Sequence, residues 1–242
     1  MLKWLAACIM FIDHFAVVFV SPHSILYYLL RLLGRLAMPI FAYYIAKGFK
    51  RTHHFKKYFT RVGLMALASQ VPFTLLGIGY SLDSLTPSAF KEVFIKKLFT
   101  SFNIGVTFLA ALLILYFQEQ FSQKARLSKQ KKLFYSFGIF LALFLSSFAD
   151  YSVYGVAMVL LFYFFNQYKE KVSFSYSYLA VAILVLTLLS FGLYGTLMQG
   201  FCILSLPLIR YVKEDGIKLP RYFFYWFYPL HMLVLVLFKF LL

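Results

Sequence analysis

The sequence predicts an all-α integral membrane protein: a polytopic bundle of about nine transmembrane helices in a single domain over residues 1–242. Three observations predict it. The chain is 62% hydrophobic and only 13% charged, whereas a soluble domain is about half apolar and about a quarter charged. Long apolar runs recur along the whole length, and the basic residues gather in the links between them. A multi-pass protein of the cell membrane accounts for all three better than a soluble domain with one anchor.

The spans follow from the lengths of the apolar runs. A helix needs about 20 apolar residues, with a range of roughly 17–25, to cross the hydrocarbon core. Nine runs approach that length: 4–20, 25–47, 58–79, 102–118, 133–149, 152–166, 177–191, 195–209 and 221–240. The runs at 152–166 and 195–209 are short, which is typical of re-entrant or partly buried segments.

Lysine and arginine predict the orientation of these spans. Alternate links carry clusters of basic residues and belong in the cytoplasm. They are 48–61, 119–132, 167–176 and 210–221. The opposite links near 21–24, 150–151 and 192–194 contain no Lys or Arg. The link 80–101 contains three lysines and reads as an amphipathic segment on the outer surface. The N-terminus is therefore predicted inside and the C-terminus outside.

Composition also argues against several other classes. The net charge of +16 would suit a nucleic-acid partner, but its confinement to links is explained by the positive-inside rule, so none is predicted. Cys8 and Cys202 lie in apolar runs and predict no disulfide framework. Asp13 and His14 interrupt the first run, and no small-residue cleavage site follows, so we interpret it as a retained helix. No metal site is predicted.

The segment 3–35 is the predicted functional centre. It places Asp13, His14, Arg31 and Arg35 within two adjacent apolar runs. Burying charge in hydrocarbon costs about 2.5–3.5 kcal/mol even on the lower scales, and such residues usually face a bundle interior or an aqueous cavity. A simple membrane anchor has no need of them.

Lys3 and His14 are eleven helical steps apart, which brings them within about 20° of the same face at a rise of about 16 Å. A cation at the cytoplasmic surface and an imidazole deep in the membrane suit a long donor with an anionic head and a reactive tail, such as acyl-coenzyme A. Lys3 would bind phosphate, and His14 would act as general base on an amine or hydroxyl. The structural alternative makes Lys3 a positive-inside residue and His14 a packing residue.

Asp13 points about 100° away from His14 on the same helix, so we expect it to pair with Arg31 or Arg35 on the returning helix. The two arginines are four residues apart and share a face. The arginine left over either extends outward to the membrane surface or stabilises a developing oxyanion.

Further polar residues predict an interior shared by several helices. The run 34–42 combines Gly, Ala and Pro, which predicts close packing and a kink. Arg61 opens the third span, Asn103 and Thr107 share one face of the fourth, and His231 lies within the last. Taken singly, each of these is more often structural. Together with Lys3, Arg31 and Arg35, the residues Arg61, Asn103 and His231 are candidate donor- or substrate-binding residues, while His14 and Asp13 are the candidate catalytic pair.

Five short segments carry a family resemblance: residues 12–14, 30–42, 48–49, 69–73 and 228–231. They resemble the TraX family, which is named for an inner-membrane protein that acetylates the N-terminus of a conjugative pilin. The likeness runs almost from end to end and is strongest over residues 1–75. Lys3 and His14, with ten residues between them, also resemble a basic-residue-to-histidine motif of the wider transmembrane acyltransferases. These resemblances imply acyl transfer with His14 as catalytic base and Lys3 as donor-binding residue. They do not fix the acceptor.

The sequence therefore predicts a membrane-embedded acyltransferase that moves an acetyl group from cytoplasmic acetyl-coenzyme A to an amine or hydroxyl of a peptide, glycan or lipid. Two rivals remain. A proton-coupled secondary transporter would also place charged residues in the membrane, although no internal repeat is visible. A non-enzymatic assembly factor for a surface structure would use the polar residues for packing alone.

Overall fold

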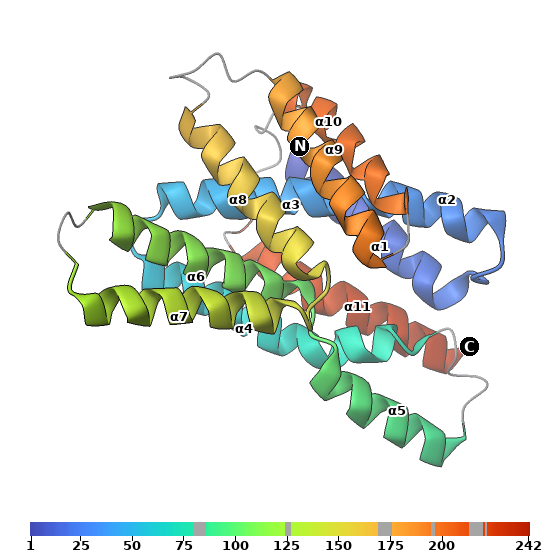
Figure 1. Cartoon of the computed structure of the whole chain (residues 1–242). Helices are drawn as coiled ribbons and strands as arrows, with labels where there is room; N and C mark the ends of the chain where they lie inside the picture. The colour runs from blue at the N-terminus through green and yellow to red at the C-terminus, as the bar shows by residue number, and fades with distance from the viewer. Residues whose placement is uncertain (80–85, 124–126, 169–175, 195–196, 213–219, 221) are drawn as a thin grey trace.

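The fold is a bundle of helices in the computed structural model, which describes residues 1–79, 86–123, 127–168, 176–194, 197–212, 220 and 222–242 (Figure 1). The described helices are α1 (Leu2–Phe19), α2 (Ile25–Gly34), α3 (Ala37–Arg51), α4 (Phe55–Leu76), α5 (Pro87–Thr100), α6 (Ile104–Gln123), α7 (Lys129–Ser146), α8 (Ser152–Tyr168), α9 (Tyr176–Tyr194), the 3₁₀ helix η2 (Leu197–Leu204), α10 (Ser205–Tyr211) and α11 (Phe223–Leu241). These ranges contain no β-strand. The predicted all-α class is thus confirmed.

Five segments, rather than nine, are long and apolar enough to cross a membrane in the described part of the chain. They are Leu2–Phe19, Ile25–Arg51, Phe55–Leu76, Ile104–Ser122 and Phe223–Leu241. The apolar stretches Ser152–Gln167 and Tyr176–Leu189 are helical but shorter. The expected span 133–149 becomes α7, whose first turn carries Lys129, Lys131 and Lys132. The structure thus supports a helical membrane protein with fewer clear crossings than the sequence predicts.

The short candidate span 195–209, for which a re-entrant or partly buried segment was also considered, is not a single α-helix in its described part. Residues 195–196 lie outside the described part, and the remainder forms η2 followed by the short α10. Gly200 falls inside η2 and Pro207 inside α10. Both residues lower helix stability, and an apolar run cannot by itself distinguish one helix from two.

The second predicted span, 25–47, is broken within the run 34–42, where a kink was predicted. Ser24 caps the start of α2, with its side chain accepting a hydrogen bond from the backbone N–H of Tyr27 at 3.1 Å. Helix α2 ends at Gly34, and α3 begins at Ala37. The break leaves Arg31 in α2 and Arg35 in the link before α3.

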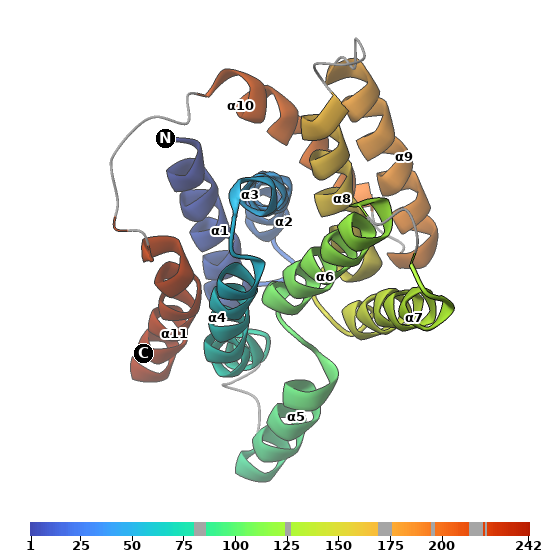
Figure 2. The same cartoon turned by 90° about the vertical axis from the view of Figure 1, so that its left-hand side faces the viewer.

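Six helices pack in a closed ring around the interior. In order of neighbours they are α1, α11, α4, α6, α8 and α3, which returns to α1. Figure 2 looks along this ring, with α4 between α11 and α6, and α1 beside α3. Helices α7 and α9 pack on the outside against α6 and α8, respectively. The ring brings the two ends of the sequence together, because α1 contacts α11 directly.

Helix α5 lies apart from the ring and buries none of its residues. Thr86 caps it and Pro87 occupies its first turn. Lys97 Nζ donates to the Gly77 carbonyl at 2.8 Å, and Gln70 Nε2 donates to the Ser101 carbonyl at 2.8 Å. The predicted separate segment in the link 80–101 is thus a helix over its described part, anchored at its C-terminal end. Its contact with a membrane surface stays a prediction.

The arrangement provides a test of the predicted orientation. The α3–α4 link and the adjoining ends of α6 and α7 lie at the left of Figure 1, and the α1–α2 link and the C-terminus at the right. We expect single cysteines at Lys56 and Lys129 to react with an impermeant thiol reagent only from the cytoplasm, and one at Ser21 only from outside. Labelling of Ser21 from the cytoplasm would reverse the orientation.

Candidate functional site

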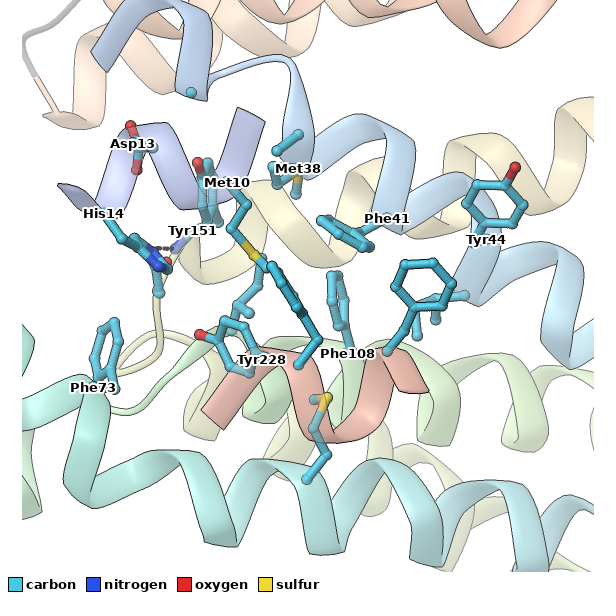
Figure 3. A pocket seen from close by; sticks show the side chains of 18 of the residues that line it. Met10, Asp13, His14, Met38, Phe41, Tyr44, Phe73, Phe108, Tyr151 and Tyr228 are labelled. Carbon is cyan, nitrogen blue, oxygen red and sulfur yellow. Dashed lines mark hydrogen bonds between the residues drawn. The ribbon is translucent and has the colours of Figure 1, made fainter. Parts of the chain in front are cut away.

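The ring encloses a cavity of about 450 Å³. Helices α1, α2, α3, α4, α6 and α11 and the α7–α8 link line it, and most of its wall is apolar or aromatic. Figure 3 shows Tyr44 at one end, and His14 and Phe73 at the other. Of the charged side chains in the described part of the chain, five reach the wall: Lys3, Asp13, Arg31, Arg35 and Asp150.

Lys3 and His14 both line this cavity, as their shared helix face predicts. Lys3 is exposed, and its Nζ lies 4.5 Å from the centre of the Tyr44 ring and 5.7 Å from that of Phe224. These distances fit cation–π contacts. The lysine therefore stands beside aromatic rings, about 16 Å of helix rise from His14. One elongated cavity connects a cation with an imidazole.

His14 contacts a second histidine. Its Nδ1 lies 2.7 Å from Nε2 of His231 on α11, and His231 Nδ1 lies 2.7 Å from the carbonyl oxygen of Phe227. The two rings are coplanar to within 3°. His231 is 5% exposed and sits behind His14 as seen from the cavity, which it does not line. We predicted a polar interior that included both histidines, but sequence reasoning did not predict this contact.

Asp13 pairs with Arg31, one of its two predicted partners. Arg31 Nη1 donates to Asp13 Oδ2 at 2.5 Å, and the two side chains are 22% and 12% exposed, respectively. The close approach depends on Gly34, because a Cβ there would collide with the Asp13 carboxylate. The carboxylate thus faces α2 rather than His14 (Figure 3). Its contacts are those of a helix–helix ion pair, and they lend no support to the expected catalytic role.

Arg35, the second arginine, turns toward the α7–α8 link. Its Nη1 donates to the Tyr151 hydroxyl at 3.3 Å, and its Nε donates to the Arg31 carbonyl at 3.4 Å. Tyr151 and Ser152 have positive φ angles of 61° and 45°. Such angles are uncommon for residues other than glycine and cluster at functional sites. Arg35 and Tyr151 therefore present two hydrogen-bond donors on the cavity wall, fixed by the surrounding structure.

Asp150 precedes Tyr151 and lies between α7 and α8. Its Oδ1 accepts the backbone N–H of Tyr151 at 3.1 Å, and its carbonyl accepts the Thr107 hydroxyl at 2.5 Å. Burial raises the pKa of the Asp150 carboxyl to about 6, although Arg35 and Arg31 oppose the shift. Thr107 lies in the first turn of α6 and uses its hydroxyl to hold this link, whereas Asn103, which was predicted to share its helix face, directly precedes the helix.

Three expected site residues are not among the described residues that line the cavity: His231, placed above, and also Asn103 and Arg61. Asn103 is fully buried, and its Nδ2 donates to the Ala66 carbonyl and to Gln70 Oε1, each at 2.8 Å, while its Oδ1 accepts the Gly105 N–H. This amide joins α6 to α4 instead of binding substrate. Arg61 lies behind Tyr58, its guanidinium carbon 5.9 Å from that ring centre. Of these two side chains, Tyr58 lines the cavity and Arg61 does not.

The aromatic lining and Tyr151 were missed by the sequence reasoning. Helices α3, α6 and α11 contribute aromatic rings to the wall: Phe41, Tyr44, Phe108, Phe224 and Tyr228. Aromatic residues make up 21% of the chain, so composition alone does not mark these few. The only local signal for Tyr151 was its position after Asp150, at the predicted outer end of a span.

Two comparisons with known proteins match nearly the whole chain. The family model described as "TraX protein" matches residues 1–239. The chain is also 26% identical to the "Probable fimbrial assembly protein FimC, serogroup H1" of Dichelobacter nodosus, over 97% of this chain and 92% of that protein. No solved structure matches the chain.

Proposed function

The chain belongs to the TraX family, and from this premise we propose that it is a membrane-embedded acyltransferase with His14 as the general base. One observation carries the proposal: a single cavity has Lys3 at one end and His14 at the other, about 16 Å apart along one helix face. The proposed donor is acetyl-coenzyme A, and the acceptor is an amine or hydroxyl of a peptide, glycan or lipid.

The residues present fit this donor. Lys3 supplies a cation for the phosphates, and the rings of Tyr44 and Phe224 beside it supply flat surfaces for the head of the molecule. The largely apolar cavity suits the narrow arm that carries the thioester. Beyond His14 the wall is made by Val17, Phe73 and Leu76, which favours a small apolar acyl group.

The proposed reaction uses the chain's own groups at two places. The acceptor nitrogen or oxygen attacks the thioester carbonyl carbon, while its proton passes to Nε2 of His14, the ring nitrogen that does not contact His231. The carbonyl oxygen becomes an oxyanion, which Arg35 and Tyr151 would stabilise with their N–H and O–H groups. The carbon–sulfur bond then breaks, and the leaving thiolate takes the proton from His14. The products are the acylated acceptor and free coenzyme A.

Purified protein in detergent or nanodiscs, incubated with radiolabelled acetyl-coenzyme A, tests this proposal. We expect slow hydrolysis of the thioester alone, and transfer when a suitable acceptor is added. A fimbrial subunit is the first acceptor to test, because a relative is named as a probable fimbrial assembly protein. Absence of both donor binding and thioester turnover would contradict the proposal.

The name of that relative also supports a second candidate, a non-enzymatic assembly factor for a surface structure. The two readings differ in what the cavity residues do. An assembly factor tolerates the loss of Lys3 and His14 if the bundle still forms, whereas an acyltransferase does not. Surface assembly in cells that carry these variants therefore separates the two candidates.

Lys3→Ala is expected to weaken binding of the acyl donor more than it slows the acyl-transfer step. It removes the cation at the cavity mouth, so the apparent donor KM should rise about tenfold, or about 1.4 kcal/mol, with little change in kcat. The difference from the parent protein should shrink at about 1 M salt, where charges are screened within about 3 Å. Lys57→Ala is the matched control, because Lys57 is exposed and does not line the cavity. An unchanged donor KM would remove Lys3 from the site.

A further inference from the structure

His14 on α1 and His231 on α11 contact each other although they are 217 residues apart in sequence. The Nδ1–Nε2 distance is 2.7 Å, the ring centres are 4.9 Å apart, and the ring planes differ by 3°. Two coplanar rings at this separation meet edge to edge, which is the geometry of an N–H···N hydrogen bond rather than of face-to-face stacking. One ring must therefore donate to the other.

The backbone decides the direction of this hydrogen bond. His231 Nδ1 lies 2.7 Å from the Phe227 carbonyl oxygen, and a carbonyl oxygen only accepts. His231 Nδ1 must therefore carry a proton. A neutral imidazole has one N–H, so His231 Nε2 is left as an acceptor, and His14 Nδ1 must be the donor. The lone pair of His14 is then on Nε2.

The surroundings hold His231 in this orientation. Its ring is 5% exposed and lies between neighbouring aromatic groups, with centres 4.9 Å from Phe227 and 6.3 Å from Phe11. Pro229 and Tyr228 on the same helix are also buried. Asp13, the carboxylate next to His14 in sequence, is bound to Arg31 instead. The neutral imidazole of His231 thus occupies the place behind the base that a carboxylate often occupies in catalytic triads.

We propose that His231 is a positioning residue: it fixes His14 in the tautomer that carries its proton on Nδ1 and so presents the basic Nε2 to the substrate. This inference rests on the proposed function, because it describes how the general base is prepared. When His14 takes the acceptor's proton, its Nδ1–H remains bonded to His231, and the bond becomes charge-assisted. His231 itself does not touch the reacting atoms.

Two isosteric variants separate this role from packing. In His231→Gln, the side-chain oxygen reaches about as far as Nε2 and accepts from His14, but the contact with Phe227 is lost. In His231→Asn, the amide nitrogen mimics Nδ1 and keeps the contact with Phe227, but nothing reaches His14. We expect the Gln variant to keep kcat within about threefold of the parent. The Asn variant should lose about 10²-fold in kcat, at the lower end of the effect of a general base, with donor KM unchanged.

The tautomer is measured directly in ¹⁵N-histidine-labelled protein in nanodiscs, without donor or acceptor. Protonated and unprotonated ring nitrogens have distinct ¹⁵N shifts, and His14→Gln assigns the His14 signals. We expect His14 to be protonated on Nδ1 in the parent and the Gln variant, and to be a mixture of tautomers in the Asn variant. A parent His14 protonated on Nε2, or equal kcat in the two variants, overturns the inference. A parent protein that shows the expected tautomer but transfers no acyl group overturns the proposed function instead. If neither variant folds, the parent spectrum still decides the tautomer.

Discussion

His14→Ala is expected to reduce acyl transfer by about 10²–10⁴-fold, the usual contribution of a general base. His14 lines the cavity at the end away from Tyr44, where the thioester would lie (Figure 3). Its removal takes away the only histidine among the described cavity-lining residues. Membrane insertion and coenzyme A binding should persist, because Lys3 and the aromatic rings around it are unchanged. Transfer from radiolabelled acetyl-coenzyme A and equilibrium binding of coenzyme A measure the two effects separately.

The control for this experiment should be a histidine that does not contact His14. His231 is unsuitable, although the sequence alone would recommend it, because it contacts His14. His23 is exposed in the α1–α2 link and serves better, so His23→Ala should retain normal turnover. Added imidazole should partly restore activity to His14→Ala by occupying the vacated space. Near-normal turnover in His14→Ala would exclude His14 as the base and favour the assembly-factor reading.

Asp13→Ala is expected to produce the largest loss of stability, about 3–5 kcal/mol, because it leaves Arg31 as an unpaired charge between α1 and α2. The ion pair is largely shielded, with side-chain exposures of 22% and 12% for Arg31 and Asp13. The double variant Asp13→Ala/Arg31→Met removes both charges and should recover much of that loss. Thermal unfolding in detergent, followed by the circular dichroism of the helices, measures the difference.

Glu92→Ala provides the matched control, since Glu92 is an exposed carboxylate on α5. We expect it to change stability by less than about 0.5 kcal/mol. If Asp13→Ala were as stable as this control, the Asp13–Arg31 pair would have no structural role. If the loss of stability in the double variant equalled the sum of the losses in Asp13→Ala and Arg31→Met, the coupling between the two residues would be absent.

The sequence by itself determined the features that depend on local periodicity. The apolar runs predicted helices, and a repeat of 3.6 residues per turn placed Lys3 and His14 on one helix face. Both residues line the cavity in the structure. The same geometry turned Asp13 away from His14 and toward the returning helix, where it meets Arg31. The break after Gly34 was visible as well, because Gly and Pro act on the backbone of their own segment.

Tertiary packing decided the rest. His231 meets His14 across 217 residues, and Tyr151 meets Arg35 across 116, because the helix ring closes α11 against α1 and brings the α7–α8 link to the cavity. Asn103 looked like a ligand residue but is used to join α4 and α6. Hydropathy measures how readily a residue leaves water, and it does not record which helix covers it. An apolar stretch such as 197–211 therefore reads as a membrane span, although it folds as two short helices.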